Sequence, residues 1–175
     1  MPRTTYAVVA AIALAAAGCG GSDSGDDAVA HVGGTAITRA QLDQTIHHFE
    51  DEASAEGRPF PEAGTAQYRT AERELVALLV YRAELVQSAA RLEVPVTERQ
   101  VAQRLRASSS EEGEQPGAFA RGTVRAQIAY EHIYRKVAAG VPAARREQVV
   151  RAWVDKMKRD YSTKVSYEPG YEPGS

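Results

Sequence analysis

The sequence predicts a mostly α-helical fold of about five helices, with minor β segments near both ends of the domain. Apolar residues recur at helical spacing over most of the chain after residue 38. Two Thr-x-x-Gln motifs, at residues 38–41 and 97–100, are typical of capped helix starts. A length of 175 residues is enough for one domain with a substantial core, and it favours one domain over two.

Residues 28–38, with the sequence AVAHVGGTAIT, predict a small β-hairpin. Apolar and polar residues alternate on both sides of Gly33 and Gly34, which form a two-residue glycine turn. An extended segment without a partner strand is the alternative interpretation. Residues 164–167 alternate in the same way, and pairing of the two β pieces would bring the ends of the domain together.

The first two helices follow from apolar spacing and from the breaks that separate them. Thr38 caps the first helix, and a glycine and two prolines within residues 57–61 end it. The longest helix spans about residues 65–92. Arg82 interrupts its wide apolar stripe, so we expect this side chain to extend to the edge of the core.

Three shorter helices complete the pattern. A second capping box at residues 97–100 starts the third helix after a proline break. Residues 108–122 are rich in serine, glutamate and glycine, which predicts a mobile loop. Apolar spacing then predicts helices over about residues 123–139 and 143–161.

The N-terminal residues 1–18 are typical of an export signal. Arg3 supplies a positive start, and residues 6–17 form an apolar stretch that is shorter than the ~20 residues of a membrane-spanning helix. Residues 16–19, Ala-Ala-Gly-Cys, match a bacterial lipobox except that alanine stands where leucine is usual. Ordinary signal-peptidase cleavage after residues 15–17 is the alternative.

Cys19 is the single cysteine of the chain, and its position predicts a lipid anchor rather than a catalytic thiol. A multiply acylated cysteine holds a protein stably at a membrane surface. Residues 20–27 consist of glycine, serine and aspartate, contain no apolar side chain and are typical of a flexible tether. A thiol discarded with the signal is the alternative. The predicted organisation is therefore a lipoprotein signal peptide at 1–18, a lipidated cysteine and tether at 19–27, and a domain at 28–175.

The composition and motifs exclude several classes of function. A net charge of −2 gives no indication of nucleic-acid binding. The sequence has no Gly-x-Ser-x-Gly elbow and no glycine-rich phosphate loop. His47 and His48 are adjacent on a predicted helix and point about 100° apart, so they cannot chelate one metal as an i, i+4 pair does. We therefore expect no catalytic residue, cofactor or metal.

Aromatic residues on the helices are the remaining candidates for binding. Most aromatics at helical spacing belong to a core, but a minority can line a groove for an apolar peptide. The sequence does not separate these two groups. The candidate groove residues, one leucine included, are Phe49, Tyr68, Leu75, Tyr81, Phe119, Tyr130, Tyr134 and Trp153.

Three stretches, taken in order, resemble the N-terminal chaperone domain of the SurA and PrsA class of extracytoplasmic foldases. Residues 29–43, VAHVGGTAITRAQLD, are similar to the opening strand, turn and helix of the family, with Gly33 where asparagine is usual. Residues 74–101 are similar to the long family helix, its break and a capped helix, with Glu93 where glycine is common. Residues 152–171 are similar to the closing helix and strand.

The resemblance implies an ATP-independent chaperone or foldase that binds unfolded or newly exported polypeptides. With the lipobox, it implies a protein anchored at the extracytoplasmic face of a bacterial plasma membrane. The family commonly carries a parvulin prolyl isomerase domain between its last two helices, which here would fall near residues 141–145, where only a few residues stand. The chain is thus expected to lack that enzyme. A prolyl isomerase and an adaptor lipoprotein with one dedicated partner are the alternatives.

Overall fold

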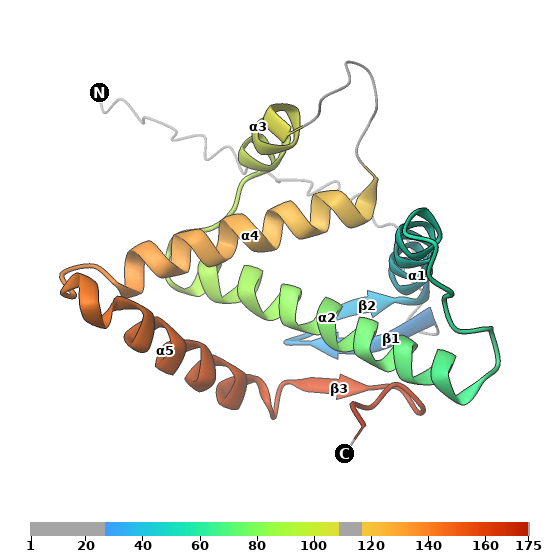
Figure 1. The fold of residues 1–175 in the computed structure, drawn as a ribbon. Helices are drawn as coiled ribbons and strands as arrows, with labels where there is room; N and C mark the ends of the chain where they lie inside the picture. The colour runs from blue at the N-terminus through green and yellow to red at the C-terminus, as the bar shows by residue number, and fades with distance from the viewer. Residues whose placement is uncertain (1–26, 109–116, 175) are drawn as a thin grey trace, which may run out of the picture.

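A computed structural model describes residues 27–108 and 117–174 and has one long helix at its centre (Figure 1). The predicted signal peptide, Cys19 and all but the last residue of the tether lie outside the described residues. No helix in the described ranges is long and apolar enough to cross a membrane.

The described residues form five α-helices and three short strands, which agrees with the sequence prediction. The α-helices alternate with loops, and a 3₁₀ turn leads into the last of them. The strands are β1 (Ala28–Val32), β2 (Thr35–Thr38) and β3 (Val165–Tyr167). The helices are α1 (Arg39–Ala55), α2 (Ala66–Arg91), α3 (Glu98–Ser108), α4 (Ala118–Val137), η2 (Ala143–Arg145) and α5 (Arg146–Tyr161).

The strands form one antiparallel sheet in the order β2-β1-β3, so the two predicted β pieces do pair. In the β1–β3 pair, Ala30 lies opposite Tyr167. Gly33 and Gly34 have φ angles of 53° and 87°, the left-handed values that a tight two-residue hairpin turn requires. The two ends of the domain are thereby joined in one sheet.

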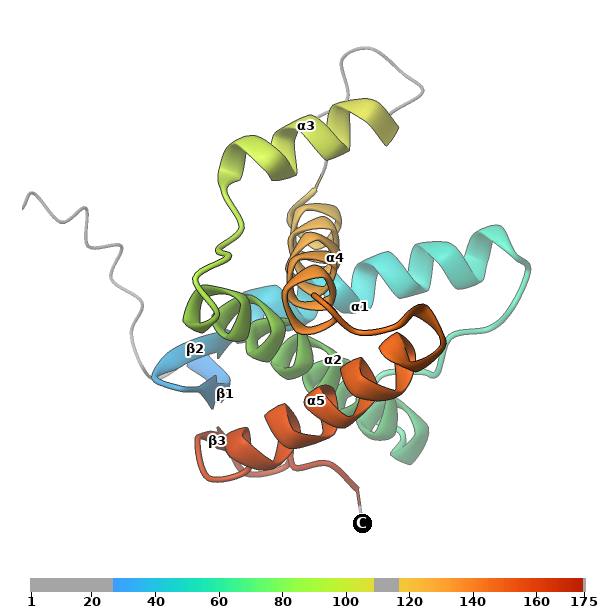
Figure 2. The same ribbon diagram turned by 90° about the vertical axis from the view of Figure 1, so that its left-hand side faces the viewer.

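The main core surrounds α2, which packs against the sheet, α1, α4 and α5 (Figures 1 and 2). Tyr161, at the end of α5, is 1% exposed, and its hydroxyl donates to Gln87 Oε1 of α2 at 3.2 Å. The amide of Gln87 in turn donates to the Val32 carbonyl oxygen at 2.8 Å. These bonds connect the last helix, the central helix and the hairpin.

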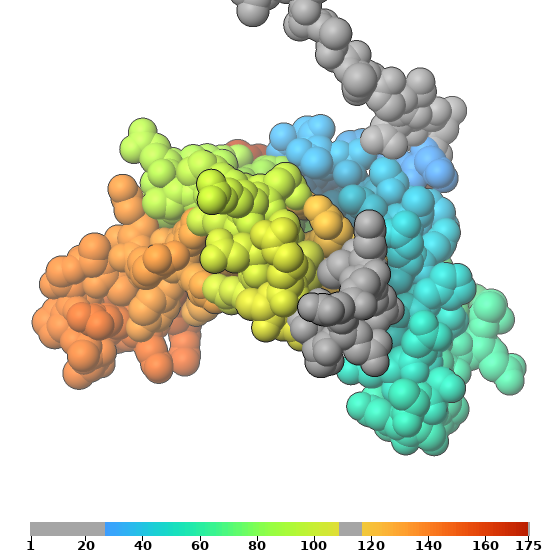
Figure 3. All heavy atoms as spheres, turned by 90° about the horizontal axis from the view of Figure 1, so that it is seen from above, coloured from blue at the N-terminus to red at the C-terminus, as the bar shows by residue number. Residues whose placement is uncertain are grey.

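A second cluster joins α3 to the outer side of α4. Its buried residues are Val101 and Leu105 of α3 and Ile128 of α4. The predicted cap of α3 is present, because the Thr97 hydroxyl accepts from the Gln100 amide N–H at 3.3 Å and Gln100 Oε1 accepts from the Thr97 N–H at 2.9 Å. Figure 3 shows α3 lying between the end of α4 on one side and α1 with the hairpin on the other.

The predicted loop at residues 108–122 is too long at its C-terminal end. Helix α4 begins at Ala118 and includes Gly122, although glycine and serine favour a loop here. The first turns are stabilised by tertiary contacts, since Ala120 and Val124 pack against the α3–α4 cluster. Tertiary packing overrides the weak local preference.

Candidate functional site

The eight candidate groove residues do not form one continuous surface. Leu75 is only 8% exposed and belongs to the core. Tyr68 contacts Phe60 edge to face, with ring centroids 6.3 Å apart, beside the α1–α2 connection. Trp153 is half-buried against the main core.

Three of the candidate tyrosines, Tyr81 on α2 and Tyr130 and Tyr134 on α4, lie near one another. Tyr130 is 40% exposed, and with Tyr134 it lines a hollow of about 390 Å³ on α4. Tyr81 of α2 lies near Tyr130, under the ammonium group of Lys158 at 5.2 Å. Burial raises the pKa of the Tyr81 hydroxyl, and the nearby Tyr130 and Glu84 raise it further.

Phe49 and Phe119 meet beside a second hollow, where α1, α2, β2 and the start of α4 come together. Their ring centroids are 5.7 Å apart in an edge-to-face arrangement. The hollow has a volume of about 370 Å³, and Phe119 lines it. We call this hollow the α1–α2–α4 pocket. It is within the range of size of natural ligand sites.

The floor of the α1–α2–α4 pocket is apolar. Leu79, Ala83 and Val86 stand at helical spacing on one face of α2, and Ile37 of β2 adjoins them. Polar groups come from α1, where Gln41, Gln44 and Thr45 line the wall. β2 runs directly into the Thr38 cap of α1, so the strand and the helix are held at a defined angle beside α2.

Arg82 lies on Phe119 at the edge of this floor. Its guanidinium carbon is 4.5 Å from the centroid of the Phe119 ring, within the range of a cation–π contact. The His48 ring stacks on the same phenylalanine, with centroids 4.0 Å apart and planes inclined by 24°. Burial lowers the pKa of the Arg82 guanidinium, which nonetheless stays charged at neutral pH.

Two further arginines complete the lining and make the pocket electropositive. Arg121 and Arg125 of α4 share one carboxylate, that of Glu98 on α3. No acidic residue lines the pocket among those the structure describes. The sequence analysis treated Arg82 only as an interruption of an apolar stripe. That interruption was the available signal that this position lines a pocket.

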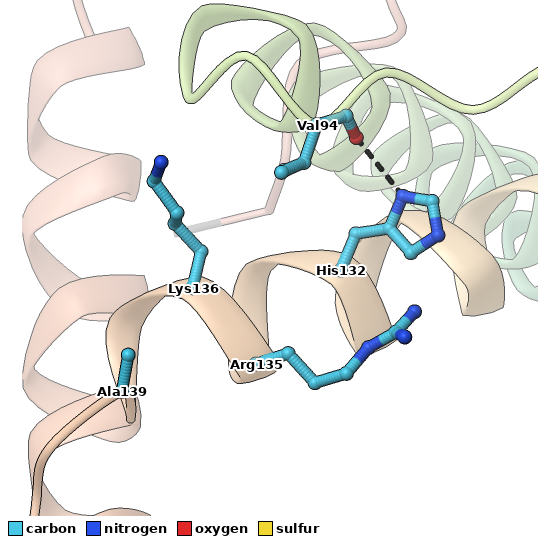
Figure 4. Close-up of a pocket in the computed structure, with 5 residues that line it drawn as sticks. All are labelled: Val94, His132, Arg135, Lys136 and Ala139. Atoms are coloured by element: carbon cyan, nitrogen blue, oxygen red, sulfur yellow. Dashed lines mark hydrogen bonds between the residues drawn. The ribbon is translucent and has the colours of Figure 1, made fainter.

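A separate hollow of about 410 Å³ lies near the end of α4 (Figure 4). His132 lines it and bonds through Nδ1 to the Val94 carbonyl oxygen at 3.0 Å. A carbonyl only accepts, so Nδ1 carries the proton, and Nε2 then accepts from the Gln100 amide at 3.3 Å. Both nitrogens of this imidazole serve to hold the α2–α3 connection and α3 against α4.

The histidines considered as metal ligands do not form a common site. His47 bonds to Glu50 at 3.1 Å on the exposed side of α1, away from the stacked ring of His48. Among the described residues, no three histidine, cysteine or acidic side chains are close enough to hold a metal ion.

Comparison with known proteins gives one match. A family model described as SurA-like N-terminal domain matches residues 4–135, from the N-terminal segment into α4. No parvulin domain is detected in the chain. No curated protein and no solved structure matches it.

Proposed function

Because the chain belongs to the family of SurA-like N-terminal domains, we propose that it is an ATP-independent chaperone for unfolded or newly exported polypeptides. The family match is the observation that carries this proposal. The α1–α2–α4 pocket supports it, because it offers an apolar floor and a half-buried aromatic ring, Phe119, in its lining.

The proposed mechanism is reversible burial of apolar client segments. Side chains of an unfolded chain would cover Leu79, Ala83, Val86 and Phe119, and each buried Å² of apolar area contributes about 25 cal/mol. The ordering of the client opposes this gain, so affinity for any one segment stays low. Weak binding to many sequences is the behaviour that a general chaperone needs.

The chaperone activity is tested by light scattering of an unrelated, chemically unfolded protein diluted into buffer. The chain from residue 20 onward keeps every described residue and suits this assay. Suppression of scattering at a near-equimolar ratio, without nucleotide, is the expected result. No suppression across several clients, with capture of one stoichiometric partner, would instead indicate an adaptor.

The location of the protein is a second part of the proposal. We place it at the extracytoplasmic face of a bacterial plasma membrane, anchored by acyl chains on Cys19 and separated from the surface by residues 20–27. Metabolic labelling with an alkyne fatty acid should mark the wild-type chain and not Cys19→Ala. If neither chain is labelled, and the wild-type chain and Cys19→Ala are found in the membrane fraction in equal amounts, the lipid anchor is contradicted.

A further inference from the structure

We propose that the α1–α2–α4 pocket is a subsite for an acidic side chain that flanks an apolar residue in a bound polypeptide. This inference rests on the proposed function, since it states which polypeptide segments the pocket selects. The bound carboxylate would meet Arg82, and the neighbouring apolar side chain would lie on the floor formed by α2.

The charge of the lining is the first argument. Arg82, Arg121 and Arg125 line the pocket, and the described lining includes no carboxylate. In the described part of the chain, two of these arginines pair with Glu98, whose side chain is 66% exposed and is shared between Arg121 and Arg125. Exposed ion pairs of this kind contribute little and exchange readily. One shared carboxylate leaves three guanidinium groups with an excess positive charge.

The state of Arg82 is the second argument. Among the described residues it has neither a hydrogen-bond nor an ion-pair partner, and its neighbour is the ring of Phe119. No side-chain nitrogen of the described residues is both buried and unpartnered, so the Arg82 donors are open to solvent. A guanidinium that lies over a ring and has no polar partner keeps its N–H groups available to bind a carboxylate through two parallel bonds.

The surroundings of Arg82 identify the ligand as part of a polypeptide. A small inorganic anion would leave the apolar floor of Leu79, Ala83 and Val86 uncovered. An acidic residue next to an apolar one covers this floor and reaches the arginine together. The Gln44 amide, which has no hydrogen-bond partner among the described residues, lies on the opposite wall and can bond to a peptide group.

The pocket is also lined by elements that are distant from one another in the sequence. Its walls come from β2 and α1 on one side and from the start of α4 on the other. Figure 2 shows β2 beside α2, and Figure 3 shows the hairpin and α1 together on one side of α3. A bound segment would therefore contact three helices that are distant in sequence.

The test measures peptide binding by calorimetry with the full chain as exported and processed by an expressing bacterium. Three peptides, acetylated and amidated at their ends, carry a Leu-Phe pair followed by Glu, Gln or Lys. We expect the Glu peptide to bind about tenfold more tightly than the Gln peptide at low salt, the effect of one charge-assisted pair. The Lys peptide should bind most weakly, and the difference should shrink at high salt.

Two variants of Arg82 test whether this residue causes the preference for the Glu peptide. Arg82→Gln should remove the difference between the Glu and Gln peptides, and Arg82→Lys should leave an intermediate difference because it keeps the charge without the planar fork. Arg91→Gln is the matched control, because Arg91 also lies on α2 over an aromatic ring, Tyr161 at 4.7 Å, but outside the pocket. Thermal unfolding of each variant shows whether the fold is retained.

The outcomes separate this inference from the chaperone proposal. Equal binding of the three peptides, with aggregation still suppressed, would overturn the acidic subsite and leave the chaperone activity standing. Absence of both peptide binding and suppression would overturn both. Preference for a Leu-Phe peptide with a free C-terminal carboxylate over the internal Glu peptide would overturn the side-chain assignment in favour of chain-end recognition. An unchanged preference in Arg82→Gln would place the anion elsewhere.

Discussion

The core around α2 and the smaller cluster between α3 and α4 both contain buried aliphatic side chains, but the core around α2 contains many more of them. The main core buries residues from the sheet, α1, α2, α4 and α5, and its members lie far apart in the sequence. The second cluster buries Val101, Leu105 and Ile128. Around it, polar contacts connect α3 to α4. They include a bidentate ion pair in which two guanidinium nitrogens of Arg104 each donate to a carboxylate oxygen of Glu131 at 2.9 Å.

This difference indicates how stability is distributed. A helix that buries two aliphatic side chains and depends otherwise on exposed polar bonds opens at a lower free energy than the whole domain does. α3 also carries Glu98, which neutralises two arginines of the α1–α2–α4 pocket. Local opening of α3 would therefore raise the positive charge at the pocket without unfolding the core.

The largest effect is expected from Ile133→Ala in the main core. Ile133 is fully buried on α4 against α2, and an isoleucine-to-alanine change at such a site costs about 2–5 kcal/mol through lost burial and the cavity left behind. Urea unfolding followed by circular dichroism should show a lower midpoint with one cooperative transition. A second transition, with part of the helix signal retained, would contradict a single core around α2.

A smaller and more local effect is expected from Leu105→Ala in the second cluster. The side chain is 6% exposed, so its loss costs about 2 kcal/mol, the lower end of the range for leucine. Hydrogen exchange should accelerate in α3, while amides in the middle of α2 keep their protection. Equal acceleration in both helices would show that α3 is part of the main cooperative unit.

Gln100→Ala should weaken the same region by about 1 kcal/mol, the net contribution of a typical hydrogen bond. The side chain caps α3 at Thr97 and donates to His132, so its removal loosens both the helix start and its attachment to α4. Gln103→Ala, on the exposed side of the same helix, is the control. Similar rates of amide hydrogen exchange in α3 of the two variants would show that the Gln100 hydrogen bonds do not stabilise α3.

The smallest effect is expected to be a gain in stability, from Glu84→Gln in the main core. Glu84 is 7% exposed, and burial raises the pKa of its carboxyl group, partly offset by Lys158. The protonated form is favoured in the fold, so stability is lost as pH rises through the raised pKa. The variant should melt a few degrees higher at pH 7.

The pH dependence of Glu84→Gln provides its own check. Below the ordinary glutamate pKa of about 4.3 the wild-type carboxyl is neutral too, and the advantage of the amide should vanish. Glu74→Gln, at an exposed position of the same helix, is the control and should change melting little at either pH. A lower melting temperature for Glu84→Gln at pH 7 would mean that the pair with Lys158 outweighs the cost of burial.

Interactions between near neighbours in the chain were predictable from the sequence. The caps at Thr38 and Thr97 and the glycine turn at Gly33 and Gly34 depend on contacts within a few residues, and all are present. The apolar spacing also predicted the five helices. The start of α4 was not predictable in this way. Its local residues favour a loop, and contacts with α3, α1 and α2 stabilise it as a helix.

The candidate site shows the same division. The sequence by itself showed that Phe119 is an aromatic residue of either the core or a groove, and that Arg82 interrupts an apolar stripe. Only the tertiary structure decided that these two side chains touch, that two arginines of α4 join them, and that Glu98 is their shared counter-charge. The physical reason is that local spacing sets which face of a helix a residue occupies. The partner of that face is set by how distant helices pack.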